Sequence, residues 1–168
     1  TISTERSMKL MEGYKTTTFS LNDTLNDLIS ILLVKNNTNI QFADIPFVLA
    51  LNRVTLSIET LINESGTKIN ADFTQAPLVK FNQPYLESIF QNLITNSIRY
   101  KHSSRPPEIF ISTSIKENEV IFTFTDNGIG FNMELVKDKI FGLHQKFHHH
   151  PESRGIGLYL IHAQITSF

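Results

Sequence analysis

The spacing of apolar residues in the first 40 positions predicts a helix with one narrow apolar seam. The seam advances in alternating steps of three and four through Met11, Tyr14, Thr18, Leu21, Leu25, Leu28 and Leu32. This spacing is typical of a coiled coil or helical bundle. Because so narrow a seam suits a partner helix better than a broad core, we expect residues 1–40 to form a helical arm that makes a homodimer. Packing of the arm on its own domain is the alternative.

The next 60 residues alternate between helical and extended patterns. Residues 41–46 read as an extended linker, and apolar residues from Leu51 to Ile62 share one face of a helix that Gly66 is suited to end with a left-handed cap. Alternation at residues 69, 71 and 73 predicts a strand. A further helix begins at Gln83 and Pro84. Its predicted buried side is formed by Leu86, Ile89, Phe90, Leu93 and Ser97.

The last third of the chain predicts a hairpin and a final helix. Strands are expected at 108–115 and 119–125, joined by a short turn, and the helix is expected from about Leu158. Strands mixed with helices indicate an α/β fold. We therefore expect residues 50–168 to form a two-layer α/β sandwich, with a mixed sheet and helices on one face.

The composition of the chain restricts the classes of function it can have. The chain has 168 residues, 40% hydrophobic and 18% charged, which suits one globular domain with an appendage. A net charge of −1 gives no electrostatic reason to expect nucleic acid or an anionic membrane as partner. With no cysteine, disulfides and thiolate chemistry are excluded. Since no apolar run reaches the roughly 18 residues of a membrane span, we expect a cytoplasmic domain, whether or not its parent protein is membrane-anchored.

Three short segments carry candidate chemistry, and the first is a polar stripe on the helix after Pro84. Asn92, Asn96 and Arg99 are spaced so that they share one face. Amide oxygens are hard ligands that suit Mg²⁺, and the arginine could reach a phosphate. Taken alone, the stripe is better explained as a solvated polar face.

The second segment, Asp126 to Phe131, follows a predicted strand. The Asp126 carboxylate can accept a hydrogen bond from an exocyclic amine such as that of adenine. Gly128 and Gly130 permit close backbone approach and positive φ. A plain tight turn is the alternative, and the segment lacks the three glycines of the dinucleotide fingerprint.

The third segment, Arg154 to Gly157, opens the final helix. Free N–H groups and the positive end of the helix dipole would favour an anion there, and Arg154 could contact a terminal phosphate. A glycine turn before an amphipathic helix is the alternative for Gly155 and Gly157.

In order and spacing, the three segments together resemble the ATP-binding domain of sensor histidine kinases. That domain belongs to a superfamily shared with gyrase, the ninety-kilodalton heat-shock chaperone and mismatch-repair ATPases, with the Bergerat-type fold. Asn92 to Arg99 resembles its asparagine box, and Asp126 to Gly130 and Arg154 to Gly157 resemble its two glycine boxes. Residues 140–143 and 147–148 resemble the phenylalanine box of its flexible lid.

The resemblance implies a role for each matching residue on the nucleotide. Asp126 would accept the adenine amino group, and Asn96 would ligate an Mg²⁺ that bridges the phosphates. Asn92 stands where related ATPases carry a glutamate base; since an amide cannot take a proton from water, phosphoryl transfer is favoured over hydrolysis. Arg99 and Tyr100 would contact the phosphates and the nucleotide pocket.

Other implied roles concern the lid. Gly155 and Gly157 would let it close over the phosphates, and Phe141 and Phe147 would anchor it unless they are ordinary core aromatics. His148 to His150, with His144, could bind a metal adventitiously, but an exposed lid segment is the better interpretation.

Two features depart from the family pattern. No histidine precedes His102, so the usual acceptor helix is absent and we expect no self-labelling at that site. The family also continues beyond the final helix with two more strands, so we expect an unfilled sheet edge.

The implied function is ATP binding for phosphoryl transfer to a histidine elsewhere, with relay to the receiver domain of a response regulator. An ATPase or conformational clamp of the same superfamily, and a non-catalytic dimeric scaffold, are the alternatives.

Overall fold

The computed structural model describes residues 41–145 and 155–167, together with 6–8, 10, 11, 13, 14, 17, 18, 21 and 32 in the arm. Two compact units can be distinguished along the chain. Residues 39–141 form the central unit, and residues 1–38 with 142–168 form the terminal unit.

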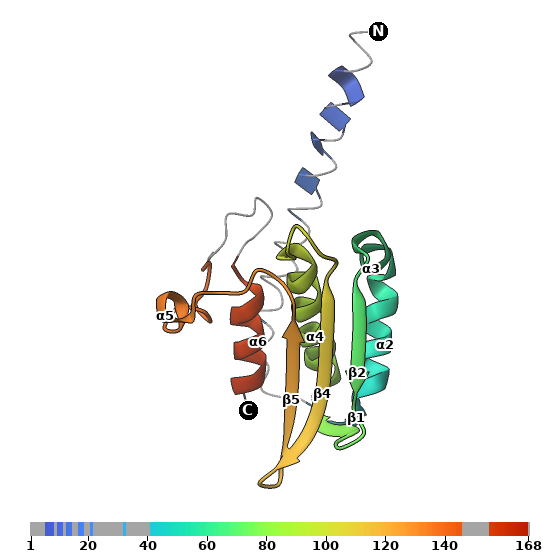
Figure 1. The fold of residues 1–168 in the computed structure, drawn as a ribbon, viewed down its shortest axis with the longest axis vertical. Helices are drawn as coiled ribbons and strands as arrows, with labels where there is room; N and C mark the ends of the chain where they lie inside the picture. The colour runs from blue at the N-terminus through green and yellow to red at the C-terminus, as the bar shows by residue number, and fades with distance from the viewer. Residues whose placement is uncertain are drawn as a thin grey trace. The chain divides into compact units, whose positions relative to one another are not determined.

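A mixed three-stranded sheet is the frame of the central unit (Figure 1). Strand β4 (Glu108–Lys116) lies in the middle, parallel to β2 (Lys68–Asp72) and antiparallel to β5 (Glu119–Asp126). Glu117 and Asn118 form the turn between β4 and β5 with φ of 51° and 69°, as a tight hairpin with right-handed strand twist requires. The predicted hairpin and mixed sheet are confirmed. Among the described strands, β5 pairs with β4 alone.

A second, smaller sheet corrects one prediction and adds an unexpected strand. The segment interpreted as a linker contains β1 (Ala43–Pro46), which pairs antiparallel with β3 (Leu78–Phe81). Both strands have four residues, and in β1 only Ile45 is buried. So short an alternation gives little periodic signal, which explains why neither strand was predicted.

Three helices belong to the central unit's helical layer. The single helix expected through Leu51 to Ile62 is divided into α2 (Phe47–Ser57) and α3 (Glu59–Ser65), because Ile58 leaves helical geometry with φ −118° and ψ 23°. Gly66 ends α3 in the predicted left-handed conformation, φ 67°. Helix α4 (Gln83–Arg99) begins as predicted; the Asn82 side chain caps it by accepting a hydrogen bond from the Tyr85 amide at 3.2 Å.

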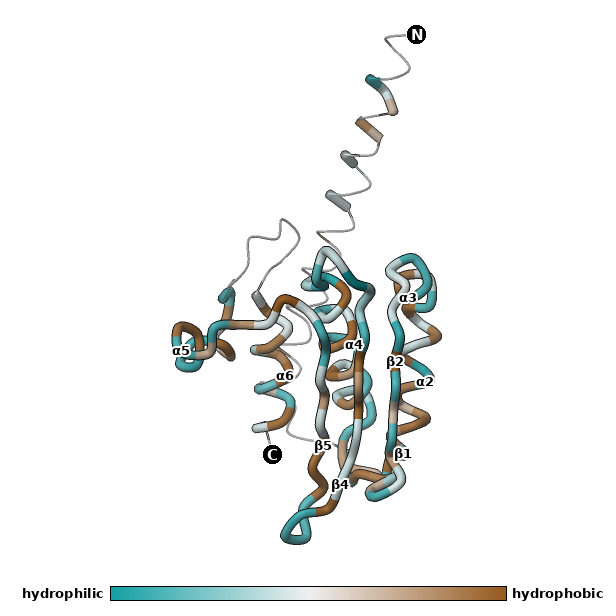
Figure 2. Tube along the Cα trace, viewed as in Figure 1, coloured by the Kyte–Doolittle hydropathy of each residue, from teal (hydrophilic) through white to brown (hydrophobic). Residues whose placement is uncertain are grey.

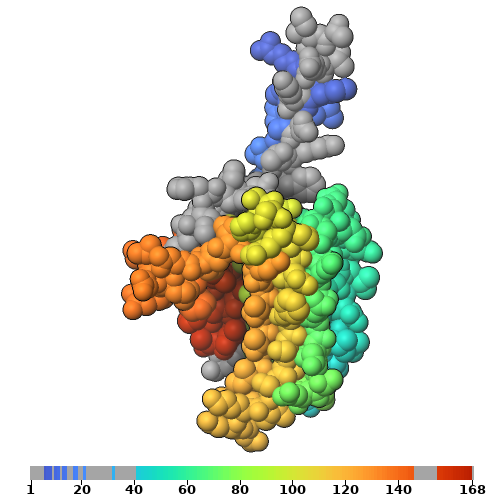
Figure 3. All heavy atoms as spheres, in the orientation of Figure 1, coloured from blue at the N-terminus to red at the C-terminus, as the bar shows by residue number. Residues whose placement is uncertain are grey.

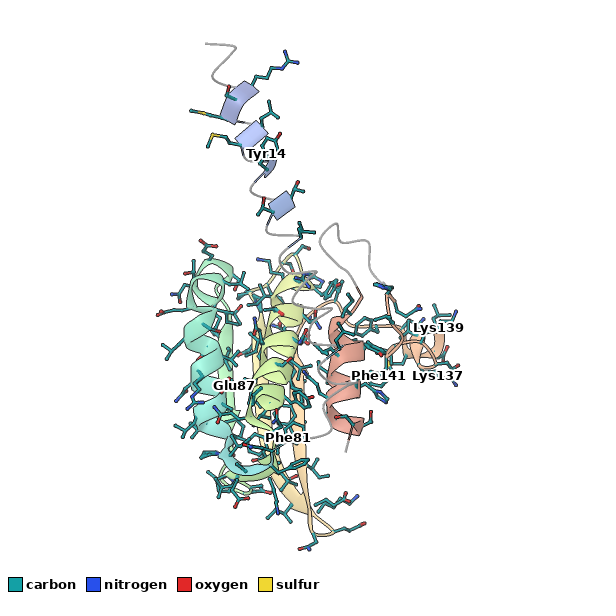
Figure 4. The ribbon with its side chains drawn as sticks, turned by 180° about the vertical axis from the view of Figure 1, so that it is seen from behind. Tyr14, Phe81, Glu87, Lys137, Lys139 and Phe141 are labelled. Atoms are coloured by element: carbon teal, nitrogen blue, oxygen red, sulfur yellow. The ribbon has the colours of Figure 1, made fainter. Side chains whose placement is uncertain are left out.

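These helices cover one face of the sheet, and the core lies between the two layers (Figures 1 and 4). The largest fully buried side chains are Phe47, Phe90, Ile94, Ile109 and Ile111. Phe90 meets Phe122 of β5 edge to face, with ring centroids 5.5 Å apart. On the outer surface of the helical layer, Arg53 of α2 forms an ion pair with Glu87 of α4, N–O 3.1 Å (Figure 4).

Burial alternates along β4, although apolar residues occur on both of its faces (hydropathy in Figure 2). In β4, Ile109 and Ile111 face the helices and are buried, whereas Phe110 between them is 50% exposed. The surface of β4 and β5 opposite the helices is visible in Figure 3. The two-layer α/β prediction is therefore confirmed for the central unit.

The remaining elements are short. In the central unit, α5 (Met133–Val136) follows the loop after β5, and in the terminal unit α6 (Gly157–Thr166) begins one residue before the predicted start. The described arm residues are helical, with exposed Met11, Tyr14, Leu21 and Leu32; Leu25 and Leu28 lie outside the described residues. No helix among the described residues has the length and apolarity needed to cross a membrane.

Candidate functional site

A carboxylate held by two donors is the centre of the candidate site. Asp126 is the last residue of β5, and its side chain is exposed. Its Oδ1 accepts the amide N–H of Gly128 at 2.8 Å, and its Oδ2 accepts the hydroxyl of Ser97 at 3.2 Å. The second bond links the end of β5 to α4. The carboxylate is therefore fixed in orientation while it stays accessible to a ligand.

Ser97 was predicted on the buried side of α4, and it is indeed buried, at 4% exposed. Its Oγ also lies 3.0 Å from the carbonyl oxygen of Leu93. A hydroxyl has one proton and cannot donate to both acceptors at once. Because hydrogen bonds to a charged acceptor are stronger, the ionised Asp126 competes well for that proton. Sequence reasoning missed this role; a polar residue inside an apolar helix face is the signal that could have shown it.

The two glycines after Asp126 are required for different reasons. A Cβ on Gly128 would lie 2.7 Å from the carbonyl oxygen of Tyr100, which accepts the Ile129 amide at 3.0 Å. Gly130 has φ 65°, and a Cβ added there would meet no atom within 4 Å. Close approach therefore explains Gly128, and positive φ explains Gly130.

The polar stripe on α4 ends beside this loop. Asn92 and Asn96 are half-buried, Arg99 is exposed, and the Tyr100 amide donates to the Asn96 carbonyl at 2.9 Å. The Asn92 Nδ2 donates to the Ser88 carbonyl at 2.9 Å, which holds this side-chain amide against its own helix. Because Ser97 is next to Asn96, the Ser97–Asp126 bond brings the stripe and the carboxylate into one region of the central unit. Amide oxygens there fit the preference of Mg²⁺ for hard donors.

The glycine-containing segment before α6 belongs to the terminal unit. Gly155 has φ 68°, and a Cβ there would overlap the backbone of Gln145, so only glycine fits. Gly157 is the first residue of α6, where free N–H groups suit an anion. Arg154, Phe147 and residues 148–150 lie outside the described residues. Phe141 is 47% exposed, which rules out the core-aromatic alternative for that residue.

Metal-binding side chains of other kinds do not gather elsewhere in the described part of the chain. No group of three or more His, Cys, Asp or Glu residues there could hold a metal ion. His102 instead takes part in a local turn, in which its Nδ1 accepts the Ser104 amide at 3.2 Å. His102 thus lies in the loop between α4 and β4.

Comparison with known proteins agrees with this fold. The family model described as histidine kinase-, DNA gyrase B- and HSP90-like ATPase matches residues 81–168. Cyanobacterial phytochrome A of Nostoc sp. is 34% identical over 109 residues, 65% of this chain and 14% of that protein. The phytochrome-like protein Cph1 of Synechocystis sp. is 30% identical over 137 residues, 80% of this chain and 18% of that protein.

Solved structures of histidine kinases share the fold. Histidine kinase AdeS of Acinetobacter baumannii has a TM-score of 0.75 at 22% identity, covering 95% of this chain and 73% of that one. Full-length ShkA in complex with AMPPNP has a TM-score of 0.71 at 17% identity, over 88% and 31% of the chains. The structure of ThkA in complex with the response regulator TrrA has a TM-score of 0.62 at 18% identity, covering 77% of this chain and 38% of that one.

The fold is therefore that of the catalytic domain of a histidine kinase, with an aspartate and a glycine loop at the end of β5 beside an asparagine-bearing helix. The chain belongs to the family of histidine kinase-, DNA gyrase B- and HSP90-like ATPases. It spans less than a fifth of the length of the two phytochrome relatives.

Proposed function

We propose that this domain binds ATP with Mg²⁺ and that Asp126 recognises the adenine amino group. The observation that carries this proposal is the exposed Asp126 carboxylate, held by the Ser97 hydroxyl at 3.2 Å and the Gly128 amide at 2.8 Å. Each carboxylate oxygen has two lone pairs, so each can accept one further bond. An exocyclic amine is a matching donor, whereas the carbonyl of guanine at the equivalent position would face a negative charge. The site should therefore select adenine.

The phosphate end of the nucleotide is assigned to α4. In this proposal Asn96 ligates the Mg²⁺, Arg99 contacts a phosphate and Tyr100 borders the nucleotide. Proximity supports it, since Asn96 precedes Ser97, the residue that bonds to Asp126. The free N–H groups that open α6 support a phosphate-binding role for Gly155 and Gly157. Mg²⁺ bound to Asn96 and phosphate oxygens would offset the charge that develops as the phosphoryl group leaves.

We further propose that the reaction is transfer to a histidine rather than hydrolysis. The Asn92 amide cannot act as a base, and its Nδ2 already donates to the Ser88 carbonyl at 2.9 Å. Transfer breaks the bond between the γ-phosphorus and its bridging oxygen and forms a phosphorus–nitrogen bond to an imidazole of another segment or chain. Likeness to ThkA, solved with a response regulator, supports subsequent relay to a receiver-domain aspartate. The exposed apolar residues of the helical arm support dimerisation.

Calorimetric titration with a non-hydrolysable ATP analogue, with and without Mg²⁺, tests the proposal. We expect one-to-one binding that Mg²⁺ strengthens. Asp126→Asn replaces an acceptor oxygen by a donor, so the affinity should fall by roughly 10- to 100-fold, the worth of a hydrogen bond to a charged group. Asp44→Asn, on the exposed part of β1, makes the same change away from the site and should leave the affinity unaltered.

Three outcomes would count against the proposal in distinct ways. Unchanged affinity in Asp126→Asn would refute the adenine assignment. No binding by a sample with a cooperative unfolding transition would favour the scaffold alternative. Rapid steady release of phosphate from ATP by the unmodified chain would favour the ATPase alternative.

A further inference from the structure

The residue after Asp126 is bonded through all of its polar groups to one segment of the chain. The Asn127 amide donates to the Glu108 carbonyl at 3.2 Å, and its side-chain Oδ1 accepts the Glu108 amide at 2.9 Å. Its Nδ2 donates to the Pro106 carbonyl at 3.1 Å. Its own carbonyl oxygen accepts two bonds from Arg105, at 3.0 Å from Nε and 2.7 Å from Nη2. Residues 105–108 thus hold the start of the glycine loop.

The Arg105 contact differs from the others because it comes from an exposed side chain. Its planar guanidinium donates from both Nε and Nη2 to one carbonyl oxygen, so two bonds must break before that carbonyl can turn away. A bidentate arginine on a backbone carbonyl 22 residues away has no part in the apolar core. Its removal should therefore alter the loop without unfolding the domain.

The atom that Arg105 holds belongs to a peptide unit with a second, opposed task. The Asn127 carbonyl and the Gly128 N–H lie on the same planar peptide and point in opposite directions. While Arg105 holds the carbonyl, the N–H is directed at Asp126 Oδ1, 2.8 Å away. A rotation of this peptide would remove the donor from Asp126 and turn a carbonyl oxygen towards its negative charge. The orientation of one peptide thus decides whether the carboxylate is supported or repelled.

Resting on the function proposed above, we propose that Arg105 is a positioning residue for adenine binding. By clamping the Asn127 carbonyl, it keeps the Asp126–Gly130 loop in the conformation that presents the carboxylate to the adenine amino group. Apparent affinity falls in proportion to the fraction of molecules in the competent conformation. The clamp raises that fraction without touching the nucleotide.

Titration of Arg105 variants with the non-hydrolysable ATP analogue and Mg²⁺ tests the clamp. We expect Arg105→Ala to weaken binding by roughly 3- to 10-fold, the worth of an ordinary hydrogen bond, because solvent screens the charge of this exposed guanidinium. Arg105→Lys keeps the charge but lacks the planar guanidinium, so its affinity should lie between those of Arg105→Ala and the unmodified chain. Arg53→Ala is the matched control; it removes an exposed arginine that pairs with Glu87 on the helical layer, and its affinity should equal that of the unmodified chain.

Two further measurements separate positioning from other roles. Inorganic triphosphate with Mg²⁺ lacks adenine, so its affinity should be unchanged in Arg105→Ala; equal weakening of both ligands would mean that the guanidinium binds phosphate directly and would overturn the proposal. In the ligand-free protein, hydrogen exchange of the Gly128 amide should become faster in Arg105→Ala than in Arg53→Ala.

The exchange experiment also keeps the clamp distinct from the proposed function. If the unmodified chain binds no nucleotide, the proposed function and the adenine role of Arg105 both fail, while faster Gly128 exchange would still show that Arg105 orients the peptide. If the chain binds the analogue and Arg105→Ala changes neither affinity nor exchange, only the clamp is refuted.

Discussion

Alanine substitutions at Gly128 and Gly130 distinguish a steric requirement from a conformational one within the same loop. A Cβ on Gly128 would lie 2.7 Å from the Tyr100 carbonyl oxygen and 2.8 Å from Asp126 Oδ1. The carboxylate can rotate, but the Tyr100 oxygen is backbone at the end of α4 and yields less readily. A Cβ on Gly130 would meet nothing within 4 Å, yet its φ of 65° disfavours alanine.

The expected magnitudes follow from the bonds that each variant loses. To relieve the overlap in Gly128→Ala, the loop must move away, which lengthens the Ile129–Tyr100 bond of 3.0 Å and the Gly128–Asp126 bond of 2.8 Å. Two exposed hydrogen bonds at about 1 kcal/mol each give about 2 kcal/mol. The smaller unfolded-state entropy of alanine offsets about 0.5 kcal/mol of this loss. Gly130→Ala should cost about 1 kcal/mol, the strain of a left-handed alanine.

Urea denaturation of both variants, with asparagine at each position as a second substitution, measures these costs. Asparagine tolerates positive φ, so Gly130→Asn should recover part of the loss, whereas Gly128→Asn should be no more stable than Gly128→Ala. A Gly128→Ala variant that matches the unmodified chain within about 0.5 kcal/mol, the usual scatter of surface substitutions, would refute the steric explanation. Recovery by asparagine at position 128 would equally refute it, because only conformational strain is relieved that way.

Two further predictions concern a buried hydroxyl and an exposed carboxylate. Ser97→Ala should weaken binding of the ATP analogue by roughly 3- to 10-fold because Asp126 loses a hydrogen-bond donor. Thr95→Ala is the control, because the Thr95 hydroxyl donates to the Gln91 carbonyl and not to the site. Equal affinities of the two variants in calorimetry would contradict the role of Ser97. Hydrogen bonds from the Thr74 hydroxyl and amide hold the pKa of Asp72 below its ordinary value in the folded protein. The ionised carboxylate therefore stabilises the fold above the unfolded-state pKa. This stabilisation is lost as the pH falls through the lower folded-state pKa. Asp72→Asn should therefore lose less stability on acidification below about pH 4, and a thermal-melt profile identical to that of the unmodified chain would rule this out.

Long periodic segments were predictable because their burial depends on one repeating pattern. Helix α4 and the β4–β5 hairpin lie close to their predicted bounds, since each buries one face against the other layer. The break at Ile58 left no signal, because an apolar residue on the helical face fits a continuous helix equally well. Strand β3 is held by pairing with β1, a contact between segments about 35 residues apart along the sequence that local periodicity cannot report.

The sequence predicts which residue types form the candidate site, but not the hydrogen bonds that join them. Asp126, Gly128 and Gly130 could be singled out because a carboxylate and two glycines after a strand restrict the chemistry available. Ser97 stands out only as a polar residue on an apolar helix face, and Arg105 carries no signal at all; the partners of both, 29 and 22 positions away, cannot be read from the sequence. Neither spacing belongs to a helix or strand period, so no pattern search along the chain would join them.

The polar contacts that hold the 126–129 loop are separate from the apolar core that stabilises the fold. Ser97, Tyr100 and Arg105 lie at the end of α4 or in the segment after it, and each bonds to a different residue of the 126–129 loop. The core that holds the layers together is apolar and lies elsewhere, around Phe90 and Ile94. Loss of one polar tether therefore shifts the loop between conformations while the core stays folded. By the same linkage, a nucleotide that binds only the tethered loop must stabilise it, so affinity and loop order have to change together in every variant of these three contacts.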